Sequence, residues 1–185
     1  PNSGAKALWR GPWAGISRTN WILTNIDKSP KISDAKKTQY KGEAHFLRGL
    51  YYFNLVRLFG DVPWIDKQQT ASDDLQVSRT SKDIVYQHII DDFSDAASML
   101  PAVYENTTDI GRATKGAAFG LLAKVYLTLK RYNETLVAID SVTNLGVYSL
   151  NRKYEWNFSD LRENGPESLF EVQYEKDVTA YSEFD

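Results

Sequence analysis

Side chains capable of catalysis are few in this sequence. It has two histidines, His45 and His88, and no cysteine, which excludes thiol nucleophiles, disulfides and thiolate metal ligands. Both histidines lie in stretches with helical periodicity, where a packed or surface histidine is commoner than a ligand or a base. The H-E-x-x-H, G-x-S-x-G and G-x-x-x-x-G-K-[ST] patterns do not occur. We therefore expect a protein that is not an enzyme and that uses neither a metal ion nor a cofactor.

The acidic side chains also form no recognisable catalytic or metal-binding pattern. Asp73 and Asp74 are adjacent in the sequence, and so are Asp91 and Asp92. Neighbouring side chains on a helix point about 100° apart, so Asp91 and Asp92 are poorly placed to share a metal ion. A glycosidase needs two carboxylates about 5–9.5 Å apart across a cleft, and nothing in the sequence points to such a pair.

Tryptophans give the clearest binding signal. Trp9 and Trp13 are four residues apart and would share one face of a helix, and Trp64 stands in a predicted loop. A flat ring can bury the apolar face of a sugar while nearby polar side chains bind its hydroxyl groups. We predict Trp9, Trp13 and Trp64 as ligand-binding residues, with core packing as the alternative. Trp21 has apolar sequence neighbours, and we expect it in the core.

The charge distribution argues against a nucleic-acid-binding protein. Residues 1–50 hold nine basic and three acidic side chains, whereas the rest of the chain holds 13 basic and 21 acidic ones. A nucleic-acid-binding domain is usually strongly basic, but this chain has a net charge of −2. We interpret the basic residues near the N-terminus as a solvated helix face, with a polyanion-binding patch as the alternative.

Helical periodicity dominates the elements that must position these residues. Apolar side chains recur every three or four positions, and this pattern predicts five helices, at about residues 5–27, 36–59, 81–100, 114–129 and 133–145. Pro12 interrupts the first of them. The second is apolar nearly all round, which predicts a buried central helix. Since no run of about 18 apolar residues occurs, we predict no transmembrane helix.

The order of these helices predicts an all-α fold of tetratricopeptide-like helical pairs. The pairs, about 36–100 and 114–145, would stack as the units of such a repeat do. Residues 61–79 show little periodicity and are predicted to form a long loop. Residues 168–174 alternate between apolar and polar side chains. We therefore expect at most one or two short strands, near the C-terminus.

A series of segments in the central helix and after it forms a recognisable pattern. These segments are GEAHFLRGLYYF at 42–53, LVRLFGDVP at 55–63, IIDDF at 89–93, LP at 100–101, GRATKGAA at 111–118, LAKVYL at 122–127 and ESLFEV at 167–172. Together they strongly resemble the SusD/RagB family of outer-membrane nutrient-binding lipoproteins. The resemblance covers most of residues 20–175 in the expected order.

This resemblance implies a SusD-like α-α superhelix in a cell-surface, glycan-binding component of a polysaccharide uptake system. Such a component hands its ligand to a SusC-like TonB-dependent transporter and is held at the outer membrane by a lipid anchor, which we expect outside this chain. Family members are longer, so we expect residues 1–185 to be the N-terminal part of a single SusD-like domain, whose remainder covers the apolar central helix. Two alternatives stay open: a helical scaffold of the transporter complex without sugar affinity, and a relative that binds peptides or glycopeptides.

Overall fold

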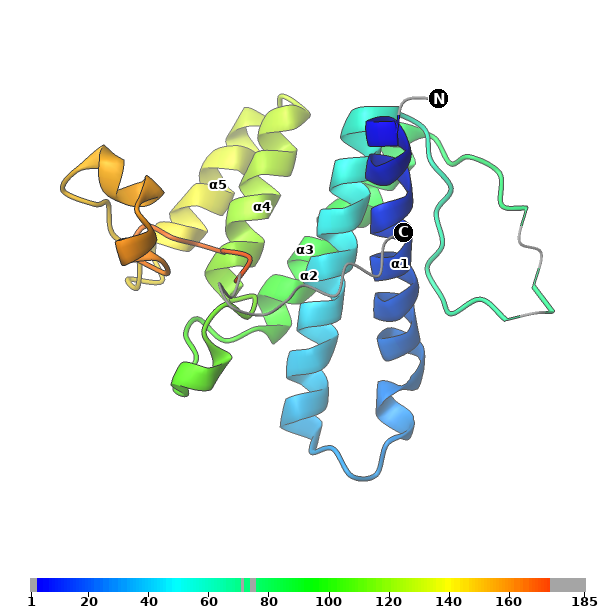
Figure 1. Ribbon diagram of the computed structural model, residues 1–185, viewed down its shortest axis with the longest axis horizontal. Helices are drawn as coiled ribbons and strands as arrows, with labels where there is room; N and C mark the ends of the chain where they lie inside the picture. Colours follow the sequence, from blue (N-terminus) through cyan, green and yellow to red (C-terminus); the bar gives the residue numbers. More distant parts are fainter. Residues whose placement is uncertain (1–2, 71, 74–75, 174–185) are drawn as a thin grey trace.

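The computed structural model describes residues 3–70, 72–73 and 76–173, and this part of the chain is helical (Figure 1). Its five α-helices are α1 (Ser3–Asn25), α2 (Asp34–Phe59), α3 (Lys82–Met99), α4 (Lys115–Thr128) and α5 (Tyr132–Thr143). Short 3-10 helices lie at Ile26–Lys28, Thr107–Asp109, Tyr154–Phe158 and Asp160–Arg162. All five predicted helices are present, so the predicted all-α fold is confirmed.

Helix α1 runs without a break through Pro12. Its inward face follows the helical period, because Trp9, Trp13, Ile16 and Asn20 are separated by four, three and four residues. Ile16 and Asn20 are fully buried, and both tryptophans are partly buried against the core. This face packs against α2.

Helix α2 is the central helix, as predicted. It begins at the cap residue Ser33, whose hydroxyl accepts the Lys36 N–H, and it ends at Gly60, which has a φ of 70°. It packs against α1 on one side and α3 on the other. A Cβ atom at Gly49 would lie 3.1 Å from the ring of Phe93 on α3, so a glycine in the middle of α2 lets the two helices approach closely.

Helices α4 and α5 form the second pair, and α4 also packs against α3. The Thr114 hydroxyl caps α4 by accepting the Ala117 N–H. Lys130 takes a left-handed conformation with a φ of 59°, which reverses the chain between α4 and α5. Each helix therefore packs on its neighbour in the sequence, and the pairs stack side by side (Figure 1).

The predicted strand at 168–174 is wrong for the residues that the structure describes, because residues 168–173 form no strand. Tyr174 lies outside the described residues. A strand needs a neighbour to hydrogen-bond with, and only an isolated bridge between Val62 and Thr80 occurs in the described part of the chain. The segment packs by its side chains instead, with the Phe170 ring centroid 4.9 Å from that of Phe46.

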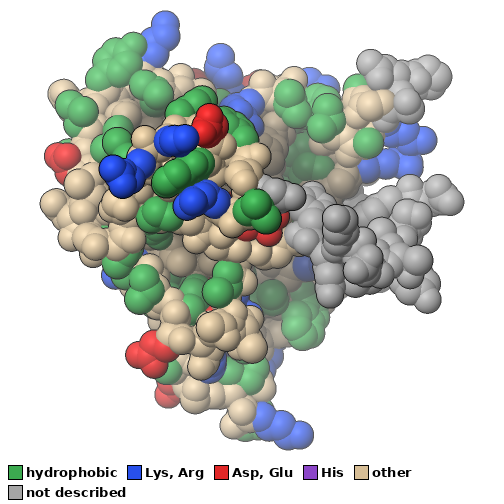
Figure 2. All heavy atoms as spheres, turned by 60° about the vertical axis from the view of Figure 1, so that its left-hand side comes forward, with side chains coloured by type: hydrophobic (Ala, Val, Ile, Leu, Met, Phe, Trp, Pro, Cys, Tyr) green, Lys and Arg blue, Asp and Glu red, His purple; other side chains and the backbone are tan. Residues whose placement is uncertain are grey.

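The exposed apolar surface lies elsewhere than expected. Helix α2 is covered by α1 and α3, and Phe46, Tyr52 and Phe53 on it are at most 1% exposed. On the side that carries α5 and the segment after it, hydrophobic side chains lie among Lys and Arg side chains at the surface (Figure 2). The exposed large hydrophobic residues there are Tyr132, Leu136, Val137, Ile139, Val147, Leu150, Tyr154, Phe158 and Leu161.

Among the described residues, the helices lack the length and apolar content that crossing a membrane requires.

Candidate ligand-binding site

The three predicted ligand-binding tryptophans belong to one aromatic cluster around Tyr52 of α2. The Tyr52 ring centroid lies 6.0 Å from that of Trp13 and 4.2 Å from that of Trp64. Trp9 contacts Trp13 edge to face at 5.4 Å, and it contacts Phe59 at 5.0 Å. Such edge-to-face pairs each add about 0.5–1.5 kcal/mol beyond the area they bury. The cluster ties α1, α2 and the loop after α2 together.

Trp64 is the member of this cluster that reaches a hollow in the protein surface. The loop between α2 and α3 encloses a hollow of about 250 Å³, lined by Trp64, Ile65, Asp66, Lys67, Gln69, Asp73 and Val77. The His88 ring stacks on the Trp64 ring, with centroids 4.3 Å apart and planes 12° apart. The hollow thus combines an aromatic wall with carboxylate, ammonium and amide groups, which is the mixture that a sugar ring and its hydroxyl groups require.

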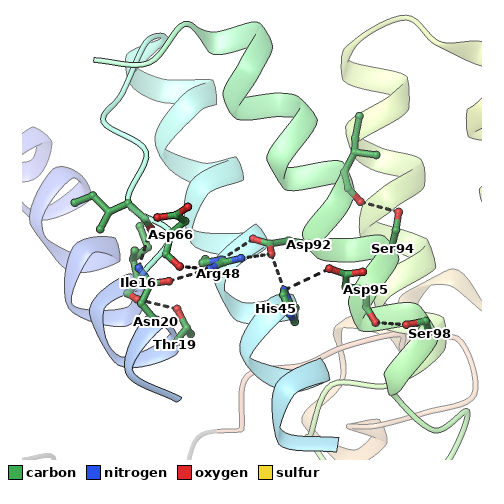
Figure 3. Close-up of polar contacts among 12 residues, drawn as sticks. Ile16, Thr19, Asn20, His45, Arg48, Asp66, Asp92, Ser94, Asp95 and Ser98 are labelled. Carbon is green, nitrogen blue, oxygen red and sulfur yellow. Dashed lines mark hydrogen bonds and ion pairs between the residues drawn. The ribbon is translucent and has the colours of Figure 1, made fainter. Parts of the chain in front are cut away.

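A buried arginine of α2 holds this loop in place (Figure 3). Arg48 is 8% exposed, and its Nη1 donates to the Asn20 side-chain oxygen on α1 at 2.9 Å and to the Asp66 carbonyl at 3.0 Å. Its guanidinium carbon also lies 5.4 Å from the Trp64 ring centroid. Arg48 thereby links α1, α2 and the residues that line the hollow.

The charge of Arg48 is balanced by Asp92 of α3, which is 2% exposed. Arg48 Nε donates to Asp92 Oδ2 at 2.9 Å, and Arg48 Nη2 donates to Asp92 Oδ1 at 2.7 Å. This two-pronged geometry is the strongest form of an arginine–carboxylate contact. Nδ1 of His45 lies 2.7 Å from the same Oδ1 atom, so the carboxylate is hydrogen-bonded on both oxygens (Figure 3).

Ile65 is held by hydrogen bonds to both of its backbone polar groups. The Tyr52 hydroxyl accepts the Ile65 N–H at 2.8 Å and donates to the Ile65 carbonyl at 3.2 Å. The Asn20 side-chain nitrogen donates to the same carbonyl at 2.7 Å. Burial raises the pKa of Tyr52 well above its ordinary value, because the charged phenolate is unfavourable there. The hydroxyl therefore keeps its proton and donates to the loop.

The prediction that Trp21 lies in the core is wrong, since its side chain is 56% exposed. The buried positions of α1 include Ile16, Thr19 and Asn20, and the position after Asn20 points about 100° away from that face. Apolar neighbours in the sequence suggested burial, whereas the spacing of the inward face shows that Trp21 points to solvent.

Two further features of the described part of the chain bear on the site. No group of three or more His, Asp or Glu side chains there is placed to hold a metal ion, and Asp91 is exposed where its neighbour Asp92 is buried.

A second hollow, of about 500 Å³, lies between α4 and residues 151–171. Sequence patterns do not indicate this hollow, because polar lining residues such as Asn151, Arg162 and Glu167 lie in segments without helical periodicity.

Fold and site define an all-α protein whose long loop forms an aromatic-walled hollow beside its first helix pair. The chain belongs to the SusD-like family. The family's sequence model, described as "Starch-binding associating with outer membrane", matches residues 2–127.

Individual relatives agree with this assignment. The chain is 26% identical over 170 residues to SusD-like protein P25 of Formosa agariphila, covering 92% of this chain and 32% of that one. The crystal structure of a SusD-like protein from Bacteroides fragilis matches with a TM-score of 0.85 at 33% identity, over 93% of this chain and 34% of the other. A structure named as a laminarin-binding SusD-like protein matches with a TM-score of 0.81 at 28% identity, over 89% of this chain and 36% of the other. The chain thus spans about a third of the length of the curated relatives it matches.

Proposed function

We propose that this chain is the N-terminal part of a single SusD-like domain in a glycan-binding protein of the outer membrane. In this proposal the protein captures an oligosaccharide at the cell surface, where a lipid anchor outside this chain holds it, and passes the ligand to a SusC-like TonB-dependent transporter. Membership of a family described as starch-binding and outer-membrane-associated supports this role. A structural neighbour is named for binding laminarin, and the matched relatives are named as binding or SusD-like proteins rather than as enzymes.

The observation that carries the proposal is the hollow walled by Trp64. Its polar lining residues Asp66, Lys67 and Gln69 offer acceptors and donors for sugar hydroxyl groups. Trp64 is partly buried, with His88 and Tyr52 against its ring at 4.3 and 4.2 Å, so it offers the hollow only the part of the ring that these two neighbours leave uncovered. Trp9 and Trp13 support it from within the protein by packing against Phe59 and Tyr52. Because the loop backbone is fixed at Ile65 by Tyr52 and Asn20, little ordering entropy is lost when a ligand binds.

A helical scaffold without sugar affinity is the second candidate. It is favoured by the exposed apolar side chains of α5, among them Leu136 at 61% and Val137 at 66%, since exposed apolar surface marks protein interfaces. In that case the transporter would bind this protein in a pull-down, but no oligosaccharide would bind it.

Oligosaccharide binding to the full protein tests the first candidate. We would titrate wild type, Trp64→Ala and Gln69→Ala with hexasaccharides of starch and laminarin and with hexasaccharides from other polysaccharides, using calorimetry. We expect Trp64→Ala to abolish measurable binding and Gln69→Ala to weaken it about three- to tenfold, which corresponds to one lost hydrogen bond. Gln69 lies at the surface, so its variant reports binding without disturbing the aromatic cluster.

The matched control is Gln87→Ala on the exposed face of α3, outside the hollow. It should bind as wild type does. If none of the hexasaccharides binds wild type, or if Trp64→Ala and Gln69→Ala both bind as wild type does, the hollow is not the glycan site.

A further inference from the structure

The described tryptophans differ in whether a ring face is open to a ligand. Trp64 carries His88 and Tyr52 at centroid distances of 4.3 and 4.2 Å. Trp156 has the guanidinium of Arg162 3.7 Å from its ring centroid. Trp21 is 56% exposed, and no ring or cation contact to it occurs among the described residues. Stacking on a sugar needs an accessible ring face, and Trp21 is the described tryptophan that offers the most.

Trp21 lies beside the loop that forms the hollow. On a helix the residues three and four positions on share its face, and these are Thr24 and Asn25. Both bind Gln68 of the loop: the Gln68 N–H donates to the Thr24 hydroxyl at 3.3 Å, and the Asn25 side-chain nitrogen donates to Gln68 Oε1 at 2.7 Å. Gln68 is flanked by Lys67 and Gln69, which line the hollow. A continuous polar strip thus joins the hollow to the Trp21 side of α1.

The surroundings of Trp21 suit a sugar rather than an apolar partner. Ser17 and Arg18, one turn earlier on α1, are exposed, as are Thr24 and Lys28 on the following turns. These side chains supply hydroxyl, guanidinium and ammonium groups around an apolar ring face, whereas a protein-docking patch would place further apolar side chains there.

We infer that Trp21 forms a second sugar subsite, continuous with the hollow walled by Trp64. The ligand is then a chain of linked sugars that extends from the hollow past Gln68 and stacks one ring on Trp21. This inference rests on the proposed function and deepens it, because it assigns the protein to extended oligosaccharides rather than to single sugars or disaccharides.

Chain length separates the two subsites experimentally. We would titrate the full protein with the hexasaccharide that binds best among those tested above, and with the matching disaccharide, comparing wild type with Trp21→Ala. Loss of one stacking contact should weaken hexasaccharide binding about tenfold and leave disaccharide binding in the hollow unchanged. In wild type, the hexasaccharide should also change tryptophan fluorescence more than the disaccharide does, and Trp21→Ala should remove that difference.

The matched control is Leu8→Ala, because Leu8 is on the same helix and is 55% exposed, yet it lies more than three turns from Trp21. It should bind both sugars as wild type does. If Trp21→Ala binds the hexasaccharide as tightly as wild type, or loses only association with a transporter, the second subsite is refuted while the proposed function stands. If wild type binds no oligosaccharide, the proposed function fails and this inference fails with it.

Discussion

Replacing the buried carboxylate Asp92 with an amide tests whether the polar network in the helical core holds the structure together. In Asp92→Asn the side chain keeps its size, but the Arg48 guanidinium loses the charge that balances it. Arg48 is 8% exposed and Asp92 is 2% exposed, so water cannot replace the lost interaction. In wild type, Arg48 donates to both carboxylate oxygens of Asp92, at 2.9 and 2.7 Å. In the variant one of these oxygens becomes an amide NH2 group, which cannot accept, and the other belongs to a neutral amide.

The expected cost follows from this burial. Removing one partner of a buried ion pair typically costs 3–5 kcal/mol, because it leaves an unbalanced charge in the interior. His45 also loses a carboxylate acceptor at 2.7 Å, which places the estimate near the upper end, at about 4–5 kcal/mol. With a urea dependence of about 2 kcal/mol per molar, the midpoint should fall by roughly 2 M.

Urea unfolding followed by circular dichroism measures this shift, and the sequence provides a matched control. Asp91 is the preceding residue on α3, it is exposed, and its side chain accepts one hydrogen bond, from Gln87. Asp91→Asn should change stability by no more than about 0.5 kcal/mol. A double variant, Arg48→Met with Asp92→Leu, should be less destabilised than Asp92→Asn, because it removes both charges. A loss below about 1 kcal/mol in Asp92→Asn would refute the role given to this pair.

Two further predictions concern packing and pH. Gly42→Ala should destabilise the chain by about 1–3 kcal/mol, because the added Cβ would lie 2.9 Å from Met99 Cβ. Gly120→Ala should be nearly neutral, because its Cβ would meet only the flexible end of Leu169 and the helix gains up to about 1 kcal/mol of propensity. Equal losses of stability for the two variants in thermal unfolding would contradict this contrast. Burial raises the pKa of Tyr52 above its unfolded value, so the stability that its proton supports is complete below pH of about 10 and is lost as pH rises above it. In Tyr52→Phe, the free energy of unfolding, measured by urea titration at a series of pH values, should fall less steeply above pH of about 10 than in wild type. The same steepness in both proteins would show that Tyr52 does not lose its proton on unfolding.

The helices could be predicted from the sequence because their determinants are local. Apolar residues repeat every three or four positions, Thr114 caps α4, and Gly60 ends α2. Each of these signals acts within a few residues along the chain, so one sequence suffices to recognise them. The same holds for the loop after α2, which the lack of periodicity in residues 61–79 indicates.

The orientation of the tryptophans required the full period of α1 rather than nearest neighbours. Trp9, Trp13, Ile16 and Asn20 form one inward stripe, which places Trp21 outside it. That stripe is visible in the sequence, and its period alone places Trp21 on the outer side of α1. Asn20 obscures the stripe, because a polar side chain is not expected among buried positions.

The polar network could not be predicted in the same way. Arg48 and Asp92 are 44 residues apart, and Asn20 and Ile65 are 45 apart, so their pairing depends on how α1, α2 and α3 pack. Asp92 follows an identical residue that is exposed, and Arg48 lies on a helix whose other buried side chains are apolar or small. Nothing in such a pattern distinguishes a buried ion from a solvated one. The strand predicted at 168–174 failed for a related reason, since a strand depends on a partner that the local sequence does not specify.

The network explains how residues 64–68 of the long loop can hold a fixed conformation beside the hollow. Ordering a loop residue costs about 1–2 kcal/mol of backbone entropy, so residues 64–68 must make contacts that offset this cost. They do so at four points: the Trp64 ring against Tyr52 and His88, the backbone of Ile65 against Tyr52 and Asn20, Gln68 against Thr24 and Asn25, and the Asp66 carbonyl against Arg48. Arg48 can make the last contact only while Asp92 balances its charge. Asp92→Asn should therefore weaken ligand binding in the hollow and also lower the stability of the fold, although Asp92 itself lies on α3 and outside the lining of that hollow.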